Sequence, residues 1–133
     1  MDEHPEIVDA NFSKLSLLDE STYFAMVPWN REMTIRLFIH ADGEDLRQCL
    51  ERAQAVFSSV RKNEIGLVRK GFDEAGFAND WIDEFLYNEA LDVSIEIFPN
   101  GEGELCYSVH FLGNLIIRFS RDAVFVGAWG APC

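Results

Sequence analysis

Cysteine and long apolar runs are scarce in this chain of 133 residues. The three cysteines, Cys49, Cys106 and Cys133, lie far apart and form no CxxC pair. This spacing favours free thiols in a reducing cytosol over a disulfide framework or a zinc site. No apolar run approaches the roughly 18 residues of a membrane span, and the N-terminal stretch lacks the basic and apolar regions of a signal peptide. We therefore expect a cytoplasmic protein without a membrane segment.

The usual sequence signatures of catalysis are also missing. There is no HExxH, no GxSxG and no GxxxxGK[ST] motif, and the histidines are His4, His40 and His110. Cys106 and His110 fall on the same face of an expected strand, but at ~3.4 Å per residue they stand about 13 Å apart. That separation is too large for a thiol–imidazole dyad. We expect no catalytic residue, no cofactor and no enzymatic activity.

Positive charge is the third scarcity, because 11 basic residues face 23 acidic ones and the formal net charge is −12. Such a charge disfavours nucleic acid and anionic membranes as partners and steers cationic partners toward the protein. Solubility alone explains an acidic composition equally well. The imbalance is regional, since residues 71–117 contain ten acids and no lysine or arginine, whereas residues 47–70 are rich in bases.

What the chain does contain is enough apolar sequence for one core, because hydrophobic residues make up 48% of it. We expect a single domain over residues 1–133, with residues 1–11 as a flexible tail. Alternating apolar residues predict strands over 14–20, 22–29, 33–40, 91–98, 104–112, 115–120 and 123–129.

Helical spacing predicts a helix over residues 44–60, capped by Asp42, and a second helix that ends near Gly71 or Gly76. A short third helix is expected to begin at Asn79 or Asp80. The predicted fold class is α+β, an antiparallel sheet of about six strands with two or three helices packed on one face, in the order βββ-αα(α)-ββββ.

The most unusual stretch is residues 72–93, which hold seven carboxylates and five aromatic rings. A calcium site is not favoured, because the EF-hand ordering of ligands is absent, and no histidine is near for a transition metal. An ordinary amphipathic helix explains the aromatic residues, since Phe77, Trp81 and Phe85 recur every four residues and are expected to pack inward. A face for a basic protein partner explains the acids, and the partner-binding candidates are Asp73, Glu74, Asp80, Asp83, Glu84 and Glu89.

A second candidate surface is the face of the sheet that points away from the helices. Its apolar side chains lie among charges, as in the cores of protein interfaces, although cross-strand pairs on a wet surface give the same pattern. This alternative surface, for a protein or a small ligand, comprises Arg36, Phe38, His40, Glu96, Phe98, His110 and Arg118.

The C-terminal half also shows an order of strand and turn residues that resembles a known family. The matching positions are Trp81, Ser94-Ile95, Asn100-Gly101, Gly113-Asn114, Ile116 and Gly127 or Gly130. This order resembles the bacterial family named domain of unknown function 2262. Where that family has histidine after glycine, this chain has Asn114, so no role is carried over for that histidine.

In size, acidity and fold type the chain is similar to immunity proteins of bacterial toxin systems. This similarity of type implies a non-enzymatic bacterial protein that neutralises a basic, nuclease-like toxin by protein–protein contact. The oligomeric state and the identity of the partner are left open by the sequence.

Overall fold

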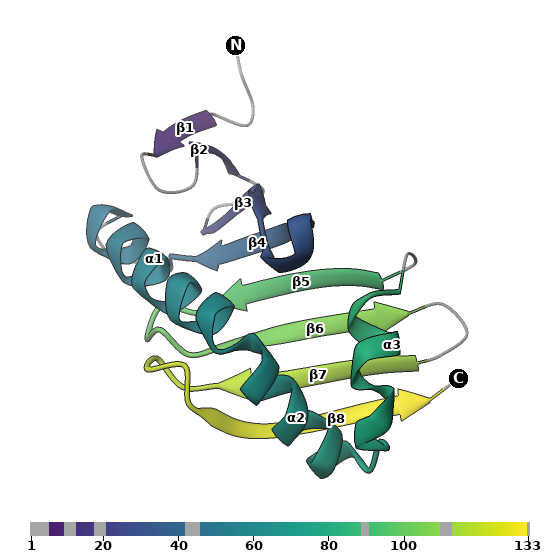
Figure 1. Ribbon diagram of the computed structural model, residues 1–133. Coiled ribbons are helices and arrows are strands. Elements are labelled where there is room, and N and C mark those ends of the chain that lie inside the picture. The colour runs from purple at the N-terminus through teal and green to yellow at the C-terminus, as the bar shows by residue number, and fades with distance from the viewer. Residues whose placement is uncertain are drawn as a thin grey trace.

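The computed structural model describes residues 6–9, 13–17, 21–41, 46–88, 91–109 and 113–132, and its strands form one eight-stranded sheet (Figure 1). The strands before the helices are β1 (Glu6–Asp9), β2 (Ser13–Leu17), β3 (Thr22–Pro28) and β4 (Thr34–His40). The helices are α1 (Leu46–Lys62), α2 (Glu64–Ala75) and α3 (Ile82–Leu86), with the short 3-10 helices η1 (Asn30–Glu32) and η2 (Asn79–Trp81). The strands after them are β5 (Leu91–Ile97), β6 (Gly103–Val109), β7 (Gly113–Phe119) and β8 (Phe125–Pro132). The predicted α+β class is confirmed.

The strand order in space follows the chain from β1 to β8, and every neighbouring pair is antiparallel except β4 and β5. The prediction of a purely antiparallel sheet was therefore wrong at one pair. The reason is the long helical connection between these two strands, which returns the chain to the end of the sheet where β4 began. The helices cover one face of the sheet (Figure 1).

The N-terminal strand β1 was not predicted, because residues 1–11 were expected to form a flexible tail. Residues 6–9 instead pair antiparallel with β2, with Ile7 opposite Leu15 and Val8 opposite Lys14. Backbone hydrogen bonds to a neighbouring strand order this short segment although its composition is polar and acidic. The sheet therefore has eight strands, where the sequence predicted seven strand segments and a sheet of about six.

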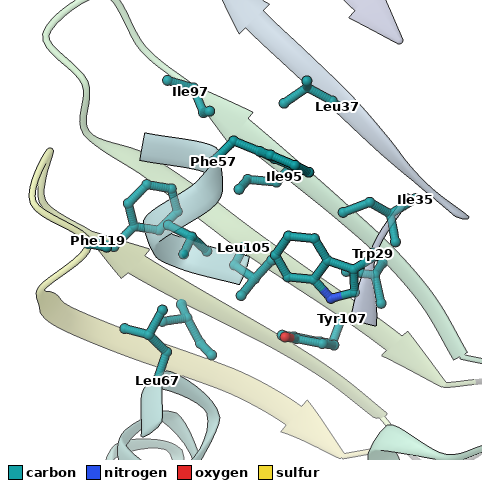
Figure 2. Packing of buried hydrophobic residues seen from close by; sticks show 14 of the residues in the cluster. Trp29, Ile35, Leu37, Phe57, Leu67, Ile95, Ile97, Leu105, Tyr107 and Phe119 are labelled. Atoms are coloured by element: carbon teal, nitrogen blue, oxygen red, sulfur yellow. The ribbon is translucent and has the colours of Figure 1, made fainter. Parts of the chain in front are cut away.

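Strict alternation along the central strands decides which face is buried, as predicted. In β4, for example, Ile35, Leu37 and Ile39 are at most 1% exposed, while the residues between them face away from the core. Figure 2 shows Phe57 of α1 and Leu67 of α2 in the same cluster as the inward side chains of the strands. Burial of these large side chains, each stabilising by roughly 1.5–3 kcal/mol, is the main force that holds the helices on the sheet.

The two long helices match their predictions closely. The expected break near residues 61–63 is present, because α1 ends at Lys62 and Asn63 lies between the two helices. At the end of α2, Gly76 adopts a left-handed conformation with φ of 80°, and its N–H donates to the carbonyl of Asp73. The predicted cap Asp42 lies outside the described residues.

Candidate protein-binding surfaces

Three of the predicted partner-binding acids meet at one cleft near the end of the helical layer. Asp73 near the end of α2, Asp80 of η2 and Asp83 of α3 line this cleft together with Arg69 and Ile82, and its volume is about 460 Å³. The acids converge because the left-handed turn at the end of α2 reverses the chain before η2 begins. Three carboxylates and one guanidinium give the cleft a formal charge of −3 + 1 = −2. We call these residues the acidic cleft.

The remaining predicted acids are placed differently. Glu74 and Glu84 are exposed but do not line the acidic cleft. Glu89 lies outside the described residues. The acidic cleft therefore contains three of the six predicted acids, and the turn between α2 and α3 brings these three together.

The aromatic residues of this region do not all point inward as expected. Phe85 is buried and packs against Phe72 and Tyr107, with ring centroids 5.4 and 5.9 Å apart. Trp81, predicted to lie in the core with Phe85, is instead 42% exposed. The helix is α-helical only from Ile82, and Trp81 belongs to the preceding 3-10 turn, whose three-residue period takes the indole off the buried stripe.

The exposed indole borders a second hollow. This hollow is mostly apolar, has a volume of about 280 Å³, and is lined by Gly76, Phe77, Ala78 and Trp81. Trp81 follows directly after Asp80 of the acidic cleft, so an aromatic anchor and a group of carboxylates share one short segment. Tryptophan is among the residues enriched at energetic hot spots, and protein interfaces surround such anchors with a polar rim.

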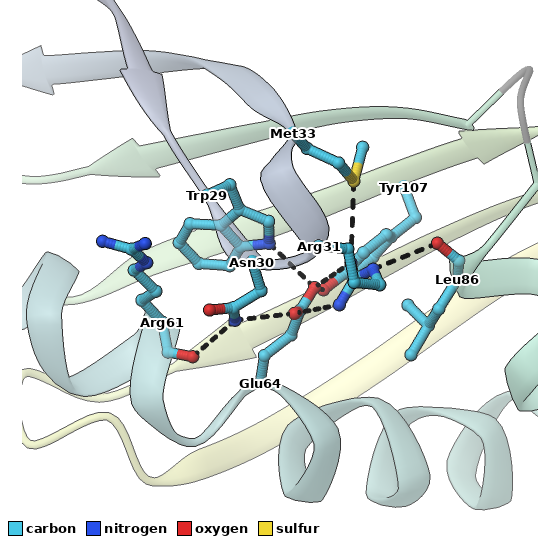
Figure 3. A network of polar contacts seen from close by, with 8 residues as sticks. All are labelled: Trp29, Asn30, Arg31, Met33, Arg61, Glu64, Leu86 and Tyr107. Atoms are coloured by element: carbon cyan, nitrogen blue, oxygen red, sulfur yellow. Dashed lines mark hydrogen bonds and ion pairs between the residues drawn. The ribbon is translucent and has the colours of Figure 1, made fainter.

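A dense network of hydrogen bonds surrounds Glu64, which the sequence analysis did not single out. Its side chain is 1% exposed, and its two oxygens accept five hydrogen bonds (Figure 3). Oε1 accepts from Asn30 Nδ2 at 2.9 Å and from Arg31 at 2.7 Å. Oε2 accepts from Trp29 Nε1 at 2.9 Å, from Arg31 at 3.0 Å and from the Tyr107 hydroxyl at 2.6 Å.

The charges of this network are stabilised by their partners. Burial by itself would raise the pKa of Glu64, but hydrogen bonds from Arg31, Tyr107, Asn30 and Trp29 outweigh it and hold the pKa below the ordinary value of 4.5. Burial and the adjacent carboxylate raise the pKa of Tyr107 well above 10, so the phenol stays protonated and donates. A carboxylate with five donors has no capacity left to act as a general base, so Glu64 is a structural anchor.

The Glu64 network ties the corner between β3 and β4 to the helical layer. Arg31 and Glu32 adopt left-handed backbone conformations, with φ of 59° and 57°, which cost free energy in residues other than glycine. The bidentate ion pair to Glu64 holds this corner in place. Arg31 Nε also donates to the carbonyl of Leu86 at 3.1 Å, so the same side chain fixes the end of α3, the helix that carries Asp83.

A signal for this network was present in the sequence. Glu64 lies four residues after Val60 and four before Val68, so it falls on the buried stripe of the helical pattern. A charged residue on such a stripe requires a buried partner. The run of Trp29, Asn30 and Arg31 at a turn supplies the donors, although their pairing with a residue over thirty positions away could not be read from the sequence.

The outer face of the sheet carries the alternative surface, and its charged residues are paired with one another. Arg36 contacts Asp92 at 2.6 Å, and Arg118 contacts Glu104 at 2.8 Å. His40 lies 3.1 Å from the Glu96 carboxylate. Such exposed pairs contribute little to stability, but they leave this face close to neutral.

Two apolar residues of the alternative surface, Phe38 and Phe98, are partly covered by their neighbours. Phe38 packs against Phe24 with ring centroids 5.3 Å apart, and Phe98 stacks on His40 at 5.2 Å. They are thus half-buried rather than fully exposed, as cross-strand pairing predicts. His110 lies outside the described residues, so its place on this face stays a prediction.

A shallow hollow of about 250 Å³ lies on the outer face, and Cys106 forms part of its lining. Burial, together with the charges of Glu104 and Glu96, raises the pKa of the Cys106 thiol to about 11. At neutral pH this thiol is protonated and a poor nucleophile. The hollow therefore offers polar contacts rather than thiol chemistry.

The described part of the chain contains no group of three or more His, Cys, Asp or Glu residues arranged to hold a metal ion. Among the same residues, no helix has the length and hydropathy needed to cross a bilayer. No family model, curated protein or solved structure matches the chain. The resemblance to domain of unknown function 2262 stays a prediction.

Proposed function

We propose that this chain is a non-enzymatic binding protein that docks on a basic protein partner through the acidic cleft. The observation that carries the proposal is the convergence of Asp73, Asp80 and Asp83 beside the exposed indole of Trp81. Carboxylates at a surface accelerate association with a cationic partner, and a neighbouring aromatic anchor supplies affinity after contact. The net charge of −12 extends this attraction beyond the cleft itself.

The partner class that fits best is a toxin with a cationic active site, such as a nuclease domain. A nuclease binds a phosphate backbone through lysine and arginine, so an acidic surface that covers these residues competes with its substrate. The protein would then be a bacterial, cytoplasmic immunity-type inhibitor. The Glu64 network supports this function indirectly, because Arg31 holds the end of α3 in a fixed position and so pre-organises Asp83.

The test begins with capture of the partner on immobilised protein at low salt and elution with a salt step. The association rate of the identified partner is then measured for the wild type and for the triple variant Asp73→Lys/Asp80→Lys/Asp83→Lys. We expect the association rate to fall by about tenfold or more and its dependence on salt to weaken, because steering charges have been reversed.

The matched control is Glu51→Lys/Glu102→Lys/Asp122→Lys, which reverses three exposed acids away from the cleft. Both variants change the formal net charge from −12 to −6, since each reversal adds two charges. A smaller effect in the control supports docking at the cleft. Equal effects in the two variants would show that only the overall charge matters, and unchanged rates in both would end the proposal.

The alternative site is the outer face of the sheet, favoured by its hollow of about 250 Å³. If that surface binds the partner, alanine at Phe38, His40 and His110 will abolish binding while the three acid reversals have little effect. The same rate measurements distinguish the two surfaces.

A further inference from the structure

The two edge strands of the sheet are protected very differently. β1 is four residues long, and its sequence EIVD has an acid at each end. β8 is eight residues long, FVGAWGAP, and contains no charged residue. Natural sheets commonly keep edge strands from pairing with another chain by making them short or charged. By this criterion β1 is protected and β8 is open to another strand.

The open edge also carries exposed apolar side chains. Of the seven large hydrophobic residues that are exposed in the described part of the chain, three lie in or next to β8: Val124, Val126 and Trp129. Trp129 lies opposite Ile116 on the outer face, and the Arg118 guanidinium is 5.7 Å from its ring centroid. This cation–π contact holds the indole on the outer face near the sheet edge.

Two glycines of β8 have different reasons to be glycine. A Cβ on Gly130 would approach the Asn114 carbonyl and the Phe77 ring to 2.7 Å, so packing within the chain requires glycine there. A Cβ on Gly127 would meet nothing within 4 Å. Gly127 therefore leaves open space beside Trp129, which lies two residues further along on the same face.

We propose that β8 pairs antiparallel with β8 of a second copy of this chain, with the two-fold axis at Ala128. In this register Gly127 lies opposite Trp129 of the other copy. Each Trp129 indole thus faces the open space at Gly127 of the other strand, and the arrangement is the same from both copies, as a two-fold interface requires. Aromatic residues that cover cross-strand glycines are a known source of sheet stability.

The beginning of β8 limits the length of this pairing. The register against β7 shifts between Arg118 and Phe119, so Val126 is an extra residue on β8 at a bulge. A bulge bends the edge strand, and it weakens pairing with another chain at the residues that precede the bulge. The segment from Gly127 onward continues in regular register with β7, so pairing about Ala128 is regular on both strands over residues 127–129.

Charge distinguishes this interface from the acidic cleft. Residues 123–133 contain no charged side chain, so the paired strands themselves do not repel each other. The two copies nevertheless each carry a formal charge of −12, and this long-range repulsion weakens as salt is added. Dimerisation through β8 should therefore strengthen with salt, whereas docking of the acidic cleft on a basic partner should weaken.

The experiment is sedimentation velocity of the full chain over roughly a hundredfold range of concentration, at low and at moderate salt. We expect a monomer–dimer equilibrium that shifts toward dimer as either quantity rises. Gly127→Lys places a charged side chain in the space that Trp129 of the other copy would cover. This variant should raise the dimer dissociation constant by about tenfold or more. Circular dichroism confirms that the variant keeps its fold.

The matched control is Met26→Lys, which places a lysine at another exposed apolar position on the outer face, in β3 and away from the edge. It should leave the dimer intact. A monomer at every concentration overturns the proposal, as does a dimer that survives Gly127→Lys. Loss of the dimer in both variants would assign the contact to the sheet face and also overturn pairing through β8.

Discussion

At the scale of single residues, Glu64 is a position where we expect substitution to be costly, because its buried carboxylate accepts five hydrogen bonds. A buried ion pair often contributes little net stability, because both charges lose their hydration. Removing one partner is nevertheless costly, since it leaves the other charge and its donors unsatisfied in the core. The donors come from Trp29 and Arg31 at the corner between β3 and β4 and from Tyr107 in β6. One carboxylate of α2 therefore connects the helical layer to two separate parts of the sheet.

Glu64→Gln should therefore lower the free energy of unfolding by about 3–5 kcal/mol, because the amide cannot neutralise Arg31. Urea unfolding followed by circular dichroism measures this loss. Glu74→Gln is the control, since it makes the same change at an exposed position of the same helix and should stay within about 0.5 kcal/mol of the wild type. A loss below about 1 kcal/mol for Glu64→Gln would contradict the role assigned to the network.

The lowered pKa of Glu64 predicts a specific loss of stability in acid. A carboxyl whose folded pKa is below its unfolded value of 4.5 contributes stability above that value, and this contribution is lost as the pH falls through the folded pKa. Below pH 4.5 the free energy of unfolding should therefore fall more steeply for the wild type than for Glu64→Gln. Urea midpoints measured from pH 7 downward test this, and parallel curves would show that other carboxyls control the acid limb.

At the scale of elements, α2 is the helix that positions the acidic cleft, and a close approach to the sheet fixes it. A Cβ added at Gly71 would come within 3.0 Å of the Ile117 side chain in β7. Glycine at this point lets the helix pack directly on the strand. The cleft residues Asp73 and Asp80 follow just after this contact, so the packing of α2 sets where the turn to α3 begins.

Two glycines of α2 should therefore respond in opposite directions to substitution. Gly66→Ala should raise the free energy of unfolding by about 0.5–1 kcal/mol, because a Cβ there has open space and alanine favours the helix. Gly71→Val should lower it by about 1–3 kcal/mol, because the added atoms overlap Ile117. Thermal or urea unfolding measures both, and a stabilising Gly71→Val would show that α2 can move away from β7 without cost.

At the scale of the whole molecule, the excess of acids is the dominant property. A formal charge of −12 on 133 residues means that acids repel one another across the folded surface. Six of the eleven bases lie on α1 and α2, where they alternate with four acids, and Arg69 lines the acidic cleft itself. Added salt should therefore stabilise the fold and strengthen dimerisation, but it should weaken docking on a basic partner.

Salt should stabilise the fold itself. Raising NaCl from about 10 mM to about 500 mM shortens the Debye length from about 30 Å to a few Å, which screens the repulsion between exposed acids. The urea midpoint should rise, and the Gly127→Lys variant should be used so that dimerisation does not contribute. The Glu51→Lys/Glu102→Lys/Asp122→Lys variant, at formal charge −6, should respond less. A midpoint that falls with salt would mean that attractive ion pairs outweigh the repulsion.

The sequence by itself determined most local elements of this protein and the faces they bury, with β1 and the exposed Trp81 as exceptions. Alternation in β4 and β5 and helical spacing in α1 follow from the backbone periods of strands and helices, so they could be predicted residue by residue. The base-free acidic region was equally visible, whereas the end of α2 was narrowed only to Gly71 or Gly76, of which the structure selects Gly76. These features depend on neighbours within a few positions of the chain.

Only the tertiary structure decided which distant residues meet. Glu64 bonds residues as far as 43 positions away, and the parallel pairing of β4 with β5 depends on how three helices cross the sheet. The exposure of Trp81, the convergence of Asp73, Asp80 and Asp83, and the position of β8 at an edge depend on the same packing. Local periodicity carries no information about these contacts, because they are selected by the shape of the whole core.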